Sequence, residues 1–194
     1  MDTSIPVKKL VFNPSGGSGV NTIAFVDQPA IMVNWIAFNE QKPIKFSIQD
    51  EERRIIFSPV LIPDLPIPRI DPVTQKPFAV MMDRETIFQV MLDWQKNGRQ
   101  NFANEMHDGK PIDGITWFNM MVTDEMMFDK APGFESLPVG TLFTAGKVMN
   151  DQVWQKIKSG EYKGISIEGF FDMLDLNPVP VDQIEAMVYE ALFD

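Results

Sequence analysis

Apolar and polar residues alternate in short runs along much of the chain, which is typical of β-strands. These runs are rich in β-branched and aromatic side chains and are separated by polar or glycine-containing turns. The predicted strands are residues 20–26, 31–38, 45–48, 54–62, 115–122, 141–148 and 165–171. The proline-dense stretch 59–72 should be a loop or a sheet edge, because proline cannot donate to a strand ladder.

Three other segments place apolar residues at helical spacing. The first begins after Asp83 and ends near Gly98, the second covers 151–159 between Asn150 and Gly160, and the third covers 182–192. The predicted inner faces are Ile87, Phe88, Met91 and Trp94 in the first helix, Val153, Trp154 and Ile157 in the second, and Ile184, Met187, Val188 and Ala191 in the third. The long segment 126–140 between two strands is predicted to be an irregular loop.

The order of these elements favours an α+β domain built on an antiparallel sheet or barrel. Strands and helices do not alternate regularly, which argues against a doubly wound parallel sheet. A length of 194 residues fits one domain, which we place at 20–176. Residues 1–19 are expected to be a flexible N-terminal segment, and 177–194 a C-terminal amphipathic helix that packs on the domain or contacts a partner.

Composition narrows the chemistry that the chain can perform. The formal net charge is -10 and the basic residues form no stripe, so we do not expect the chain to bind nucleic acid. The chain has no cysteine and one histidine, which excludes disulfides, a thiol nucleophile and Cys-based zinc sites and argues against a catalytic zinc site. No apolar run reaches the roughly 18–20 residues of a membrane span, and the N-terminus lacks a signal pattern, so we expect a cytoplasmic protein without a membrane partner.

The only histidine, His107, lies in the polar segment 105–110 before the turn signal Asp108-Gly109. Histidine is the side chain whose ordinary pKa suits acid–base chemistry near neutral pH. The sequence alone leaves open the simpler interpretation that His107 is an exposed loop residue.

Ser166 lies in the compact run 164–169, on the strand face opposite Ile165 and Ile167. Gly164 and Gly169 would leave the backbone uncrowded for a substrate or an oxyanion. The simpler interpretation is a solvent-facing serine at the end of a strand. A serine nucleophile needs a base, and the base needs an orienting group. Spacing does not choose among the acids near the two residues, which are Glu105, Asp108, Asp113, Glu168 and Asp172.

At these segments the chain resembles the XkdF-type phage serine proteases, a branch of the prohead (capsid-maturation) proteases. The resemblance is carried by residues 104–114, 153–160 and 163–169, with weaker similarity at 26–30, 46–56 and 63–64. Together these segments cover roughly residues 20 to 171, in the order found in the family.

The resemblance implies a mostly antiparallel β-barrel flanked by helices, like the herpesvirus assemblins. It also implies that His107 is the general base and Ser166 the nucleophile of a serine endopeptidase that needs no cofactor. Because the chain has no second histidine, the third member would be an acid, with Glu168 favoured over Asp172 and Glu105. The implied substrates are scaffold and capsid-precursor proteins inside an assembling phage prohead in the host cytoplasm; whether the chain forms a homo-oligomer is left open.

Two other functions stay open at this stage. One is a non-catalytic structural or scaffold-associated phage head protein on the same fold. The other is a binding module in which Met120, Met121, Met126 and Met127 form an adaptable surface, although packing in the core is the favoured role for these methionines.

Overall fold

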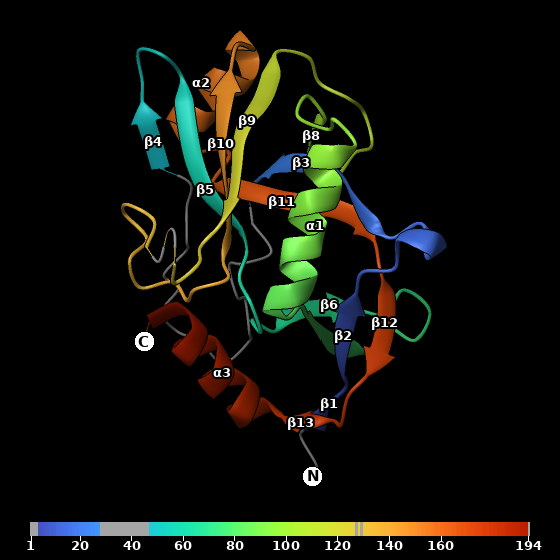
Figure 1. Cartoon of the computed structure of the whole chain (residues 1–194). Helices are drawn as coiled ribbons and strands as arrows, with labels where there is room; N and C mark the ends of the chain where they lie inside the picture. The colour runs from blue at the N-terminus through green and yellow to red at the C-terminus, as the bar shows by residue number, and fades with distance from the viewer. Residues whose placement is uncertain (1–3, 28–46, 127, 129, 194) are drawn as a thin grey trace.

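The computed structural model describes residues 4–27, 47–126, 128 and 130–193, and shows an α+β protein with three α-helices among its described residues (Figure 1). The helices are α1 (Arg84–Lys96), α2 (Asp151–Ser159) and α3 (Val181–Phe193). The strands are β1 (Ser4–Ile5), β2 (Val7–Val11), β3 (Gly19–Val26), β4 (Ser47–Asp50), β5 (Ile55–Leu61), β6 (Ile67–Ile70), β7 (Pro77–Met81), β8 (Ala103–Glu105), β9 (Ile115–Val122), β10 (Leu142–Val148), β11 (Gly164–Phe170), β12 (Asp172–Asp175) and β13 (Val179–Pro180).

The strands form four small sheets. Their orders are β4-β5-β10-β9, β11-β3-β8, β12-β2-β7-β6 and the pair β1-β13. Most neighbours are antiparallel, but β2 pairs with β7 and β3 pairs with β8 in parallel. The α+β class is therefore confirmed, whereas the strands of the described residues do not close into the expected barrel. The predicted strand at 31–38 lies outside the described residues.

Helix α1 shows why local sequence signals locate the elements well. Asp83 caps the helix by accepting the N–H of Thr86 at 2.9 Å, and Ile87, Val90 and Trp94 are buried. Phe88, expected on the inner face, is instead 42% exposed, because the buried stripe runs through Val90 rather than Phe88. Helix α2 follows its prediction, with Asn150 as the N-cap and Gly160 in the left-handed conformation at the C-cap.

Two hydrophobic clusters hold the sheets and helices together. The larger one packs α1 and α2 against β3, β9 and β10 through residues such as Phe25, Trp94, Trp117 and Trp154. The smaller one receives Ile184, Val188 and Leu192 of α3. The C-terminal helix therefore packs on the domain, which decides between the two roles expected for residues 177–194.

Residues 4–19, expected to be a flexible segment, contain two strands. Strand β1 pairs with β13, and β2 lies between β7 and β12, with Val7 buried in the smaller cluster. The N-terminal strands thus bridge the C-terminal segment and the middle of the chain, as Figure 1 shows at the base of the molecule.

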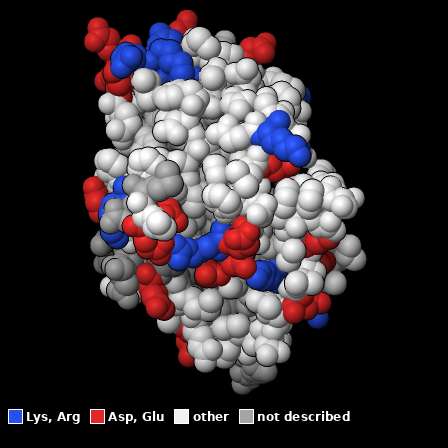
Figure 2. All heavy atoms as spheres, in the orientation of Figure 1, with Lys and Arg blue, Asp and Glu red and all other residues white. Residues whose placement is uncertain are grey.

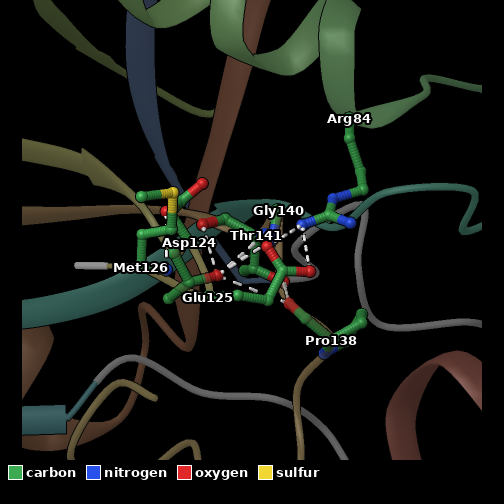
Figure 3. A network of polar contacts seen from close by, with 8 residues as sticks. Arg84, Asp124, Glu125, Met126, Pro138, Gly140 and Thr141 are labelled. Carbon is green, nitrogen blue, oxygen red and sulfur yellow. Dashed lines mark hydrogen bonds and ion pairs between the residues drawn. The ribbon is translucent and has the colours of Figure 1, made fainter. Parts of the chain in front are cut away.

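The long loop after β9 is fixed by polar contacts rather than by regular structure (Figure 3). Arg84 at the start of α1 binds both carboxylate oxygens of Glu125, at 2.9 and 3.0 Å. Gly140 (φ 97°) lies against the Arg84 side chain, where a Cβ atom would collide with it. The loop is thereby tied to the N-terminus of α1.

Most Lys and Arg side chains on the face shown in Figure 2 lie beside acidic side chains. The ion pairs of the structure include Lys9–Asp83, Arg84–Glu125 and Arg54–Asp151. No helix of the described residues is long and apolar enough to cross a membrane.

Asp83 provides a test of how the charge network supports the fold. Burial alone would raise the pKa of Asp83, but hydrogen bonds from Lys9 and Thr86 outweigh burial and lower the pKa to about 2. Because the folded pKa lies below the unfolded value, this stabilisation is present above about pH 4 and is lost as the pH falls towards 2.

We expect Asp83→Asn to keep the cap but lose the Lys9 ion pair. The free energy of unfolding at pH 7 should fall by about 1 kcal/mol, less than the pKa shift implies, because solvent screens a partly exposed pair. The difference from wild type in urea unfolding should shrink between pH 4 and pH 2. Glu85→Gln, at an exposed acid two residues further on, serves as the control. A difference between Asp83→Asn and wild type that stays constant at all pH values would contradict this origin.

Candidate active site

The sheet β11-β3-β8 brings the candidate residues of distant segments onto one face. Ser166 lies opposite Ala24 in the antiparallel pair of β11 with β3, and Ala24 lies opposite Asn104 in the parallel pair of β3 with β8. Ile23, Phe25 and Ile165 point into the larger core cluster. Because side chains alternate along a strand, Ser166, Ala24, Asn104 and Glu168 share the other face.

His107 is presented by a strained turn directly after β8. Met106 and His107 have φ values of 52° and 57°, and the Asp108 N–H donates to the Glu105 carbonyl at 3.0 Å, which closes a turn of type I′ character. Such turns usually contain glycine or asparagine, and each left-handed residue of another type costs about 1–3 kcal/mol. The Met106 N–H also donates to the Phe25 carbonyl at 2.9 Å, which anchors the turn to β3.

The Glu168 carboxylate joins β11 to this turn. Its Oε1 atom accepts a hydrogen bond from His107 Nδ1 at 2.8 Å and another from Asn104 Nδ2 at 2.7 Å. A carboxylate that accepts from Nδ1 holds the proton on that nitrogen and leaves Nε2 as the basic atom. His107 Nε2 makes no hydrogen bond to a described residue, and the ring is 39% exposed, so it can receive a proton from outside the pair.

The other candidate acids have different partners. Asp172 accepts from the Asn13 side chain at 2.7 Å, Asp108 accepts the Lys110 N–H, and Glu105 binds Lys156. Within the part of the chain that the structure describes, Glu168 alone of the five candidates contacts the His107 ring. Of the residues that we considered for the third position, the structure therefore brings Glu168 to His107, and does not bring Asp172 or Glu105.

Ser166 is 6% exposed, so the interpretation of Ser166 as a solvent-facing residue is wrong. It lines a cavity of about 200 Å³ whose other walls are mainly apolar side chains of β5, β6 and β7. The hydroxyl makes no hydrogen bond to a described residue, His107 included. Ser166 and Glu168 are separated by two strand positions on one face, or about 6.6–6.8 Å between Cα atoms.

Gly169 has a structural role that differs from the one expected. The pairing of β11 with β3 shifts register between Glu168 and Gly169, and a Cβ atom on Gly169 would collide with the Gly19 carbonyl oxygen. Glycine is required here because two strands approach closely at a β-bulge. The space that a side chain of residue 169 would occupy is filled by β3, so this glycine serves the packing of the two strands.

A second polar cluster supports the turn that carries His107. The Glu105 carboxylate accepts from Lys156 Nζ at 3.0 Å and from the Tyr162 hydroxyl, and Lys156 also donates to that hydroxyl at 2.9 Å. Burial would raise the pKa of Glu105, but the hydrogen bonds from Tyr162 and Lys156 lower it below its usual range. Burial and the bond to Glu105 raise the pKa of Tyr162 to about 12. These contacts hold the residue just before Met106 in place.

Sequence reasoning did not identify Asn104, Lys156 or Tyr162 as members of this site. The described residues contain no group of three or more His, Cys, Asp or Glu side chains placed to hold a metal ion.

Comparison with family models, with curated proteins and with solved structures found no match to this chain.

The single histidine makes the Glu168 contact directly measurable. In ¹⁵N spectra of imidazole-labelled protein we expect His107, when neutral, to be mainly the Nδ1–H tautomer, because Glu168 accepts from that nitrogen. Glu168→Gln should shift the tautomer ratio towards Nε2–H. Asp172→Asn is the matched control, because Asp172 binds Asn13 and not His107; if it changes the ratio as much as Glu168→Gln does, the orienting acid is misassigned.

The strained turn predicts a stabilising substitution. Met106 is exposed and left-handed, so Met106→Gly removes backbone strain while sacrificing little packing. We expect the free energy of unfolding to rise by about 0.5–1 kcal/mol, measured by urea denaturation. Met149→Gly, at an exposed methionine without a left-handed backbone, should destabilise or leave stability unchanged.

Proposed function

We propose that the chain is a serine endopeptidase in which Ser166 is the nucleophile, His107 the general base and Glu168 the acid that orients His107. One observation carries the proposal: Glu168 binds the Nδ1 atom of the only histidine and stands two positions from Ser166 on the same strand face. A serine, an imidazole and a carboxylate are the side chains that acyl transfer of this kind requires.

In the proposed reaction the Ser166 hydroxyl gives its proton to His107 Nε2 as its oxygen attacks a peptide carbonyl. Glu168 stabilises the imidazolium that forms, while Asn104 holds the carboxylate through its second hydrogen bond. Collapse of the tetrahedral intermediate passes the proton from His107 to the leaving amine. Water then gives a proton to His107 as it attacks the acyl-enzyme, and His107 passes that proton to the Ser166 oxygen as the second product leaves.

The resemblance to prohead proteases supplies the biological setting of the proposal. By that likeness the substrates are scaffold and capsid-precursor proteins inside an assembling phage head in the host cytoplasm, and the fold is a variant of the assemblin barrel. The order β11-β3-β8, with Ser166 on β11 and His107 in the turn directly after β8, is compatible with this likeness.

A second candidate is a non-catalytic structural or scaffold-associated phage head protein on the same fold. It is favoured by one observation: no hydrogen bond joins the Ser166 hydroxyl to His107 in the described part of the structure. Catalytic hydrogen bonds are often long in a free enzyme and tighten when substrate binds, so a chemical test must separate the two candidates.

Labelling with a fluorophosphonate is that test. An activated serine oxygen attacks phosphorus, a P–O bond forms, fluoride leaves, and the serine proton goes to the base. We expect wild-type protein to gain one adduct at Ser166, located by peptide mass spectrometry. Ser166→Ala and His107→Gln should gain none, and Glu168→Gln should react at least about tenfold more slowly.

Ser136→Ala, at an exposed serine in the loop after β9, is the matched control and should label at the wild-type rate. Absence of an adduct on folded wild-type protein would favour the non-catalytic candidate. Endopeptidase activity is measured separately, by incubating a mixture of unfolded proteins with the wild-type chain or with Ser166→Ala. We expect new peptide termini with the wild type that do not form with the variant.

A further inference from the structure

Strand β11 has an edge that is unpaired within the described residues. The Ile23 N–H donates to the Phe102 carbonyl and the Phe25 carbonyl accepts from the Met106 N–H, so the main-chain groups of Ile23 and Phe25 point towards β8. Those of Ala24 therefore point towards β11 and pair with Ser166. It follows that the N–H and C=O groups of Ile165 and Ile167 point away from β3, on either side of Ser166.

That edge borders the cavity of about 200 Å³ that Ser166 lines. Its walls are Ile165 and Ile167 on β11, Val60 on β5, and Ile67 and Val80 on β6 and β7. Both faces of β11 contribute side chains, as expected for a cavity that lies along the edge of the strand. An engineered apolar cavity of 150 Å³ is large enough for benzene, so a cavity of this size accommodates one large apolar side chain.

Arg69 adds a charge to an otherwise apolar site. It lies on the edge strand β6, lines the same cavity, and makes no ion pair among the described residues; its guanidinium donates to the Pro68 carbonyl at 2.9 Å. Arg69 as a residue is exposed, but neighbouring atoms partly desolvate its guanidinium and lower its pKa; arginine remains charged at all relevant pH values. A partly desolvated guanidinium without a carboxylate is a ready site for one.

We propose that this edge of β11 binds an extended peptide as an added strand, with an apolar side chain in the cavity and a nearby carboxylate side chain on Arg69. The main chain of the peptide pairs with Ile165 and Ile167, which brings a peptide carbonyl alongside Ser166. The proposal rests on the proposed function in taking Ser166 as the reacting group. It adds the substrate class: extended, unstructured segments that carry an apolar and an acidic residue close together.

Peptide binding to Ser166→Ala protein tests this site without requiring turnover. The probes are fluorescein-labelled alanine-based peptides with one leucine and one glutamate, at separations of one to three residues and in both orders, read by fluorescence anisotropy. We expect the best of these peptides to bind about tenfold more tightly than its Glu→Gln counterpart, and its Leu→Ser counterpart to lose a similar factor.

Adding Arg69→Met should abolish the preference for glutamate over glutamine and leave the affinity for the glutamine peptide unchanged. Arg53→Met, at an exposed arginine that does not line the cavity, should preserve the preference. Equal affinity for the glutamate and glutamine peptides, or an Arg69→Met variant that still discriminates, would overturn the proposal. So would decanoate displacing the peptides at lower concentration than the unlabelled peptide does, because an acyl chain has no main chain to pair with β11.

The two proposals fail in different ways. If the wild-type protein is not labelled by the fluorophosphonate but peptides still bind in an Arg69-dependent way, the catalytic role is rejected and the binding site is kept. Labelling without Arg69-dependent binding would keep the catalytic role and reject this substrate class.

Discussion

The pairing of β3 with two partners is the constraint on which the rest of the site depends. Ile23, Ala24 and Phe25 in its centre are completely buried, with β11 on one side and β8 on the other. Two of these side chains are anchored in the main core, so β3 cannot slip by one residue without turning Ile23 and Phe25 out of it. The register that results fixes Ser166 and Asn104 on opposite sides of Ala24, and fixes Glu168 within reach of His107.

Local strain at the end of β8 is offset by contacts that come from elsewhere in the chain. Two consecutive left-handed residues without glycine are unfavourable, yet the Glu105 side chain is bound by Lys156 and Tyr162, and the Met106 N–H is bound by β3. Tyr162 in turn stacks on Phe25, with ring centroids 5.8 Å apart. Core packing, the polar cluster and the turn therefore act on the same short segment, and the position of the His107 ring depends on all three.

Helix positions that depend on local patterns could be predicted from the sequence. Contacts that depend on the register of the paired strands could not. The caps Asp83, Asn150 and Gly160 locate two helices almost to the residue, because capping acts over one turn. The choice among five acids could not be made, because the contact of Glu168 with His107 joins residues 61 positions apart and follows from the pairing of three strands. Burial of Ser166 was missed for the same reason: alternation assigns it to the more polar face, but other sheets cover that face in the fold. The alternation of apolar and polar residues does not reveal which strands pair in parallel, as β3 and β8 do. Nor does it reveal that the described strands do not close into a barrel.

Two parts of the sheet face that Ser166 and Glu168 share offer different environments to the two halves of the proposed reaction. Glu168 and Asn104 line a second cavity, of about 430 Å³, on the side of the exposed His107 ring, whereas Ser166 lines the smaller, mainly apolar cavity. A base that exchanges protons with water benefits from exposure, and a nucleophile benefits from a site where bound peptide excludes water. Ala24 lies between Ser166 and Asn104 in the sheet and carries only a methyl group, so it leaves the face open between the two environments. A larger side chain at this position would stand between the serine and the imidazole, so the smallest chiral residue in the centre of β3 is what allows the two sides to communicate.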